Sequence, residues 1–294
     1  MDGSSAPAEF KSSTPLPGAL TREQFDALQK ELDAIRDEVM SSIGEKDARH
    51  IRRIVRVARW CAITGRSLLH FGIVPGSWIL GVIALSLAKI LENMEVGHNV
   101  IHGQYDWMND PALNSQTYEW DIVCASSNWR NYHNFQHHTH TNILGKDHDL
   151  GYGVVRVTDQ QRWSLYNLFQ PLWYGLLAHL FQWGVAVHDI KIDYFFKGKI
   201  SWKELQRRMA PFLQKTRRQM FKDYVLFPAL ALWNWPRVML GNAAANLIRN
   251  LWTNIIIFCG HFPKGVRVYT RKETENESRG QWYVRQMQGS ANIE

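Results

Sequence analysis

Two clusters of histidine at helical spacing constrain the fold of this chain more than any other feature. The first cluster is HNVIH, residues 98–102, and the second is HNFQHH, residues 133–138. Residues four apart lie on one face of a helix, so each cluster can direct its imidazoles at one point. Neutral imidazole binds iron, copper and zinc, but three or four ligands complete a zinc site. The surplus of histidine indicates two metal ions, and the predicted ligands are His98, His102, His133, His137 and His138.

Composition and charge allow two classes of partner. The 294 residues carry a net charge of +7, which suits either nucleic acid or an anionic membrane surface. The 13 Trp, 10 Tyr and 13 Phe favour the membrane, because amphipathic rings collect where water meets lipid. We therefore expect a lipid bilayer as partner and no nucleic acid. The three cysteines are widely spaced, which fits a reducing compartment, and we expect all three thiols to be buried.

The amino-terminal region divides into a tail and a helix. Residues 1–20 are rich in Ser, Pro and Gly, which predicts a disordered tail without the apolar stretch of a secretory signal. Residues 21–50 are expected to form a cytosolic helix that begins with a capping box of Thr21 and Gln24. An apolar stripe on this helix either packs on the rest of the chain or joins two copies in a dimer. The stripe consists of Phe25, Leu28, Leu32, Ile35 and Val39.

Apolar stretches predict an all-α membrane protein with four transmembrane helices in two hairpins. The first hairpin is expected near residues 58–73 and 78–95, with a break at VPGS, residues 74–77. The second hairpin is expected within residues 224–262, with a break at Trp-Pro-Arg, residues 235–237.

The charge-free segment at residues 164–187 is expected to lie flat in the membrane interface. The basic segment that follows, residues 191–222, belongs on the cytoplasmic side by the positive-inside rule. The histidine boxes and the basic segment must lie on the same side of the membrane, so the chain between them crosses the membrane twice or not at all. Its apolar run gives about 36 Å of helix, which is enough for one crossing and not for two, so it is expected not to cross. The histidine site and both termini of a multi-pass cell-membrane protein are then cytoplasmic. The basic segment binds either anionic lipid or the phosphates of an acyl carrier or a redox protein.

Three longer segments extend the pattern beyond the histidines. They are GHNVIHGQYDWMNDP at residues 97–111, NYHNFQHHTHTNILGKDHDLGYG at 131–153, and IIIFCGHFPKG at 255–265. These segments resemble the integral-membrane fatty acid desaturases, and most of all the actinobacterial (mycobacterial-type) NADPH-dependent acyl-CoA desaturases of the stearoyl-CoA type. The resemblance implies a desaturase domain over residues 51–294, truncated at the carboxyl terminus. The third histidine box of that family, QxxHH or HxxHH, has no counterpart in the sequence.

The resemblance implies a non-haem di-iron centre held by the histidines of the two boxes. His261 falls where related enzymes place a histidine or asparagine facing the metals, so it is either a ligand, a partner of a bridging water, or a helix C-terminal histidine near exposed carbonyls. Glu92 and Glu95 either orient a ligand histidine by a hydrogen bond or extend to the membrane interface. Asp147 and Asp149 either orient the site or are ordinary turn residues.

The implied activity is O2-dependent desaturation of a saturated long-chain fatty acyl-CoA, at the delta-9 position, in lipid metabolism. Acid–base catalysis cannot break the C–H bonds of unactivated methylenes, so an oxidising metal and O2 are required. The sequence contains no haem, flavin or iron–sulfur binding motif, which implies a separate NADPH-dependent reductase with a flavin and an iron–sulfur centre. The alternatives are a hydroxylase or ketolase on the same scaffold, and a catalytically inactive protein. Without the third box we expect residues 1–294 on their own to give no desaturation.

Overall fold

The computed structural model describes residues 20–263 and 265–290, and the regular elements in this part of the chain are helices. It contains no β-strand, and a single isolated bridge joins Ile143 to Tyr269. The predicted all-α class is confirmed. None of the helices in the described ranges combines the length and the apolar character that crossing a bilayer requires. The four transmembrane spans therefore stay a prediction.

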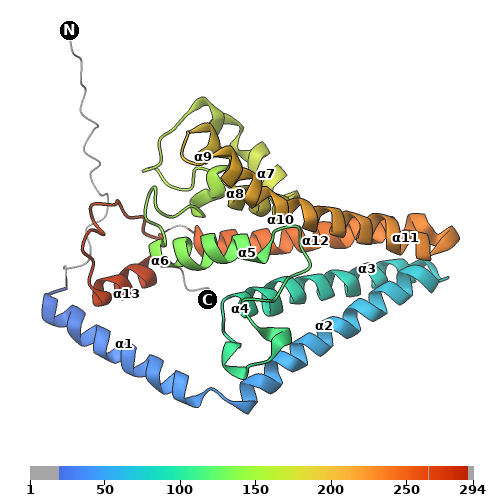
Figure 1. Ribbon diagram of the computed structural model, residues 1–294, viewed down its shortest axis with the longest axis horizontal. Helices are drawn as coiled ribbons and strands as arrows, with labels where there is room; N and C mark the ends of the chain where they lie inside the picture. Colours follow the sequence, from blue (N-terminus) through green and yellow to red (C-terminus); the bar gives the residue numbers. More distant parts are fainter. Residues whose placement is uncertain (1–19, 264, 291–294) are drawn as a thin grey trace, which may run out of the picture.

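Two long helical hairpins form the frame of the molecule, and their turns lie at the same end, on the right of Figure 1. The first hairpin consists of α2 (Glu45–Phe71) and α3 (Pro75–Ile90). The second consists of α10 (Trp202–Phe221), the π-helix η7 (Lys222–Leu226), α11 (Phe227–Leu230), the short η8 (Leu232–Asn234) and α12 (Trp235–His261). Each hairpin turns next to its predicted break: the α-helix is interrupted at residues 72–74 and at residues 231–234, whereas residues 235–237 begin α12. The second hairpin also starts before the predicted residue 224, because α10 continues through η7 into α11. In each hairpin the returning helix has a proline in its first turn, where no amide donor is needed.

The hairpins pack closely because glycines lie where α2, α3 and α12 cross. A Cβ atom on Gly65 would lie 2.7 Å from the backbone nitrogen of Leu85. A Cβ atom on Gly241 would lie 2.7 Å from a methyl carbon of Leu69, which is fully buried. The contact of α12 with α3 continues this core along Val238. These crossings fix the frame that carries the histidines at its other end.

Both histidine boxes lie on or directly after π-helical segments. The helix α3 continues through the π-helix η1 (Leu91–Gly97) into α4 (His98–Ile101). The second box lies on the π-helix η4 (Arg130–His137), between α5 (Ser126–Trp129) and α6 (His138–His140). An α-helix was expected for the second box, so the spacing argument was correct about a helix and wrong about its pitch. Short turns of 3-10 helix complete the region: η2 (Asp106–Met108), η3 (Pro111–Leu113) and η5 (Leu150–Gly153).

The segment expected to form one flat helix is divided. It forms η6 (Leu165–Phe169), α7 (Gln170–His179) and α8 (Phe181–Ile190), and the short α9 (Ile192–Phe196) follows. The helix breaks at Leu180, whose φ of −108° and ψ of 29° are not helical. Phe181 and Ala186 of α8 pack with Trp129 in the core next to the second histidine box. This segment therefore supports the histidines from one side.

The amino-terminal helix packs on the carboxyl-terminal one. Helix α1 (Arg22–Ser42) contacts α13 (Arg279–Gln288), and both begin with capping boxes, including the predicted box of Thr21 and Gln24. The predicted continuous helix over residues 21–50 is wrong, because the chain breaks between α1 and α2 at Ile43 and Gly44. Only the first half of the apolar stripe is half-buried, and Ile35 and Val39 are each 56% exposed. The predicted disorder of the tail falls on residues 1–19, outside the described residues, apart from Leu20.

The prediction of three buried thiols is wrong for two of them. Cys124 is buried, Cys61 is half-buried and Cys259 is exposed. Cys259 lies on the outer face of α12, one helical turn beyond the exposed Ile255 and Ile256.

Candidate metal centre

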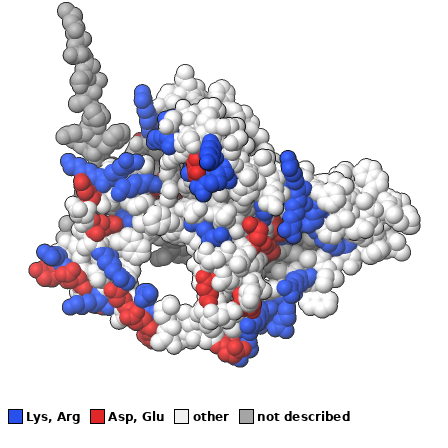
Figure 2. All heavy atoms as spheres, in the orientation of Figure 1, with Lys and Arg blue, Asp and Glu red and all other residues white. Residues whose placement is uncertain are grey.

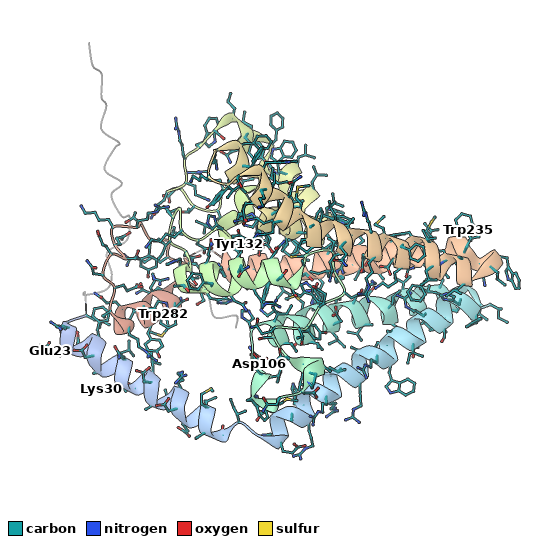
Figure 3. All side chains as sticks on the ribbon, viewed as in Figure 1. Glu23, Lys30, Asp106, Tyr132, Trp235 and Trp282 are labelled. Atoms are coloured by element: carbon teal, nitrogen blue, oxygen red, sulfur yellow. The ribbon has the colours of Figure 1, made fainter. Side chains whose placement is uncertain are left out.

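Histidines from three helices meet at the end of the frame opposite the hairpin turns. Figure 3 labels Tyr132, beside the second box, and Trp235, at the far end of α12. The ring centroids of His98 and His102 are 4.6 Å apart, and those of His102 and His138 are 4.7 Å apart. The ring of His261, at the end of α12, lies 5.1 Å from that of His137. All six histidines predicted as ligands are thus adjacent.

The potential ligand atoms form two triads that share His133. Ring nitrogens of His98, His102 and His133 lie within 4.8 Å of one another. Ligand atoms of His133, His137 and Asp149 satisfy the same limit. The Nε2 atoms of His133 and His138 are only 3.2 Å apart, so His138 adjoins both triads. With His261 beside His137, the six adjacent imidazoles offer more donors than one metal ion needs.

Buried carboxylates orient the imidazoles. The Nδ1–H of His133 donates to Asp149 Oδ2 at 2.9 Å, and the Nδ1–H of His137 donates to Asp147 Oδ1 at 2.9 Å. A histidine that donates from Nδ1 presents the lone pair of Nε2 to a metal. His261 donates from Nδ1 to the carbonyl of Ile257 at 2.9 Å, which leaves its Nε2 in the same state. His261 can therefore bond to a carbonyl of its own helix through Nδ1 and still offer Nε2 to a metal ion.

The electrostatics of the cluster suit a bound cation. Burial, together with the neighbouring imidazoles, lowers the pKa of His98 to about 3 and that of His102 to about 3. Burial likewise lowers the pKa of His133 to about 3. Burial acts to raise the pKa of Asp149, but the hydrogen bonds from His133 and His188 outweigh it and hold that pKa well below its usual range. The neutral imidazoles of His98, His102 and His133 are donors that fit iron, and the ionised carboxylate beside them favours a cation.

Glu92 and Glu95 do not orient the histidines. Glu95 is exposed, and within the described part of the chain its carboxylate makes no hydrogen bond to a histidine. Glu92 accepts hydrogen bonds from the backbone N–H of Asp121 at 3.1 Å and from the hydroxyl of Tyr118 at 3.2 Å. Glu92 therefore anchors the loop that follows α4. Glu92 lines a different groove from the cavity at His98.

Three contributors to the site were not predicted. The ring of Trp129 stacks on that of His133 at 4.2 Å and lies 5.1 Å from the ring of His98. The Nε2 of His188 lies 3.5 Å from Asp149 Oδ1. Trp129 could have been found from its position four residues before His133. No local signal in the sequence identifies His188.

The third unpredicted contributor is Arg285 of α13, which holds the end of the second box. Its side chain is 2% exposed and donates to the carbonyls of Thr139 at 2.9 Å and Thr141 at 3.0 Å. Arg285 also pairs with Glu277 at 2.8 Å. The neighbouring Gln286 donates to the carbonyl of His138 at 2.7 Å. A guanidinium at the carboxyl end of a helix satisfies carbonyls that lack helical partners.

A small cavity of about 50 Å³ adjoins the histidines. His98, His133 and His261 lie on its wall. Most of the remaining wall is apolar or aromatic and includes Met94, Trp120, Ile122, Phe181, Val185 and Ile257. The cavity can therefore present an apolar group to a metal bound by the histidines.

Comparisons with known proteins agree with this geometry. Residues 76–294 match the fatty acid desaturase family. The chain is 48% identical over 278 residues to the NADPH-dependent stearoyl-CoA 9-desaturase of Mycobacterium tuberculosis strain H37Rv. These aligned residues make up 93% of this chain. An sn-1 linoleoyl-lipid 6-desaturase of Synechocystis is 26% identical over 232 residues, covering 73% of this chain and 61% of that protein. No solved structure matches the chain.

The alignment covers only 65% of the length of the mycobacterial relatives. Even so, the family match and the 48% identity confirm the resemblance inferred from the histidine segments. The chain belongs to the fatty acid desaturase family.

Proposed function

We propose that this protein is an oxidoreductase that introduces a double bond, at the delta-9 position, into a saturated long-chain acyl-CoA at a non-haem di-iron centre. The convergence of six histidines with their orienting aspartates is the observation that carries the proposal. The name of the mycobacterial relative, a stearoyl-CoA 9-desaturase, supports the substrate class. In the balanced reaction, one CH2–CH2 unit, O2, two electrons and two protons give one CH=CH unit and two waters.

The residues of the chain would act by holding and orienting. His98, His102 and His133 would hold one ion, and His137, His138 and His261 would hold a second beside it, with Asp149 orienting His133. Bound iron would supply the oxidising power that unactivated C–H bonds require. The carboxylates of Asp147 and Asp149 keep the imidazoles in the tautomer that binds metal. The apolar wall of the adjoining cavity would exclude water from the reacting methylenes.

The proposal places four spans in the cell membrane, namely the apolar parts of α2 and α3 and the two arms within residues 224–262. The basic helix α10 and the histidine site then lie on the cytoplasmic side. Exposed apolar side chains cover the outer faces of the hairpins near their turns: Phe71, Ile73, Ile79, Leu80, Leu232 and Trp233. Figure 2 shows this end of the molecule almost free of charged side chains. In α3 the one charged residue is Lys89, in the last turn. Apolar surface of this extent is what a bilayer would cover.

A separate NADPH-dependent reductase with flavin and iron–sulfur centres would supply the electrons. The printed name of the mycobacterial relative includes NADPH dependence. Helix α10 carries six Lys and Arg against Glu204 alone, and this basic face would attract an acidic redox protein.

Product analysis tests the proposed function. The protein would be expressed from its complete gene in membranes of a host without its own desaturase, with O2, NADPH and a reductase supplied. Mass spectrometry of the acyl chains after feeding stearoyl-CoA should show a monounsaturated product, and a His137→Ala variant should show none. A hydroxylated or ketonic product would identify the sister reactions instead. Absence of any product from iron-loaded protein would contradict the assignment.

A further inference from the structure

A second concave site lies on the opposite side of the α3–η1 helix from the histidines. It is a groove of about 590 Å³ between α2, α3 and the loop that follows α4. Glu92 and Val96 of η1 line this groove, whereas the adjacent Asn93 and Met94 line the cavity at the histidines. The helix therefore separates the two spaces. A molecule in the groove cannot present its chain to the candidate metal centre, so the groove is not part of the substrate site.

One rim of the groove is a row of arginines. Arg49, Arg52, Arg56 and Arg59 follow one another on α2 at three- and four-residue spacing, and all four are exposed. Figure 2 shows basic side chains gathered over the amino-terminal half of α2. This spacing places four guanidinium groups on one helix face over about 15 Å.

The carboxylates at the groove are already engaged. Asp110 caps η3 through the N–H of Ala112 and lies 3.5 Å from Arg52. Asp121 pairs with Lys222 and lies 3.7 Å from Lys89. Glu92 is occupied by the loop that follows α4.

Arg56 and Arg59 are the cations that remain. Among the described residues neither forms an ion pair, so two cations face the groove without an anion. Guanidinium groups bind phosphate oxygens in a bidentate manner, which makes phosphate the anion that best fits this pair.

Beyond the four arginines the groove is lined mainly by apolar side chains, and the two further cations there, Arg66 and Lys89, are paired with Asp223. Val55, Ala58, Ala62, Leu85 and Ala88 line the groove in the direction of the hairpin turn. On the outer face of α2, Trp60 is 67% exposed directly after Arg59, and Ile63 is 54% exposed. Arginine followed by an exposed tryptophan is the sequence found where a helix enters the hydrocarbon layer. The arginines would then lie at headgroup level and the apolar lining at acyl-chain level.

We infer that this groove binds an anionic phospholipid, with its phosphate on Arg56 and Arg59 and an acyl chain along Ala58, Ala62 and Leu85. The inference rests on the membrane placement in the proposed function and is independent of the metal centre. A zwitterionic lipid presents a phosphate already paired with its own cation and fits the arginines less well. The groove has unpaired cations at one end and mainly apolar side chains at the other, so it fits an amphiphile better than a free anion.

Native mass spectrometry of the detergent-purified protein tests the inference. The probes are phosphatidylglycerol, phosphatidylcholine and, as a headgroup without chains, glycerol 3-phosphate. We expect phosphatidylglycerol to bind about tenfold more tightly than phosphatidylcholine, and Arg56→Gln/Arg59→Gln to abolish this preference. Arg217→Gln/Arg218→Gln removes the same charge from exposed positions on α10 and should leave the preference intact. Ala62→Phe fills the groove without changing charge and should weaken phosphatidylglycerol binding severalfold.

Three outcomes would overturn the inference. They are an unchanged preference in the Arg56→Gln/Arg59→Gln variant, an equal loss in the α10 control, and displacement of phosphatidylglycerol by equimolar glycerol 3-phosphate. Iron content, measured on the same samples, separates this test from the proposed function. The groove variants should keep the iron of the parent protein, because none of the substituted residues contacts a histidine of the cluster.

Discussion

His133 occupies the one position common to both triads, so its loss should affect more of the site than the loss of any other histidine. We expect His133→Ala to remove most of the iron from protein purified from membranes. The matched control is His148→Ala, because His148 lies outside the cluster and contacts the hydroxyl of Tyr194 at 2.8 Å. Metal analysis of both variants is the measurement. Iron unchanged in His133→Ala would refute the assignment of the second box.

Asp189 should make stability depend on pH. Burial raises the pKa of Asp189 to about 6 from its ordinary 3.8. Between those values the folded state binds more protons than the unfolded state, so the free energy of unfolding falls as the pH rises. Asp189→Asn does not titrate, and its side-chain carbonyl can still accept from the Cys124 thiol, which lies 3.2 Å from Asp189.

Thermal unfolding of the two proteins at several pH values measures the effect. The stability of Asp189→Asn relative to the parent protein should increase from about pH 4 to pH 7 and then level off. A constant difference across this range would show that Asp189 is not perturbed.

The sequence predicts those residues of the site that lie close to one another along the chain. The histidines lie four apart on their helices, and Asp147 and Asp149 follow closely in the chain, so their association with the site was foreseeable. His188 and Arg285 come from distant segments, 51 and 148 residues beyond His137, and reach the site only through the tertiary fold. Nothing in their local sequence indicates that role.

Helix α13 stabilises the second box although it contributes no predicted ligand. Arg285→Met should destabilise the protein by about 3 kcal/mol, because it leaves Glu277 unpaired and the carbonyls of Thr139 and Thr141 without their donor. It should also weaken iron retention, since those carbonyls end the helix that carries His138. Thermal unfolding and metal analysis measure the two effects.

A second substitution separates the charge from the donors. Arg285→Met combined with Glu277→Gln removes the unpaired carboxylate and should recover part of the stability, but not the iron retention. Full recovery of both would show that Arg285 acts on the fold alone.

Among the elements, the hairpin breaks were predictable and the helical pitch was not. Each break lies next to a proline, whose effect on the backbone is local. A π-helix uses the same residues as an α-helix and differs only in which amide bonds to which carbonyl, so composition does not reveal it. The apolar stripe ends at Val39, before the break between α1 and α2 at Gly44, so the stripe does not locate this break.

The placement of the whole molecule can be tested by labelling. Cysteines introduced at the exposed Asp159 and Lys199 should react from the cytoplasmic side of intact cells or vesicles. Cysteines at Ile73 and Trp233, which are 93% and 82% exposed at the hairpin turns, should react from the opposite side or not at all. A background with Cys259 replaced serves as the control, because that thiol is exposed. Labelling of all four positions from one side would contradict the two-hairpin topology.

The π-helical segments before and within the histidine boxes make the site sensitive to insertions and deletions as well as to loss of a ligand. A π-helical turn holds about one more residue than an α-helical turn, so deleting one residue from η4 would let it relax to an α-helix. The angle about the helix axis between His133 and His137 would then change, and the two rings would no longer point at one site. We expect deletion of Asn131 to remove iron as completely as loss of a ligand, while Asn131→Ala retains it. In an alignment of relatives, a one-residue deletion in these segments would therefore identify proteins that do not bind metal more reliably than substitutions of the surrounding side chains.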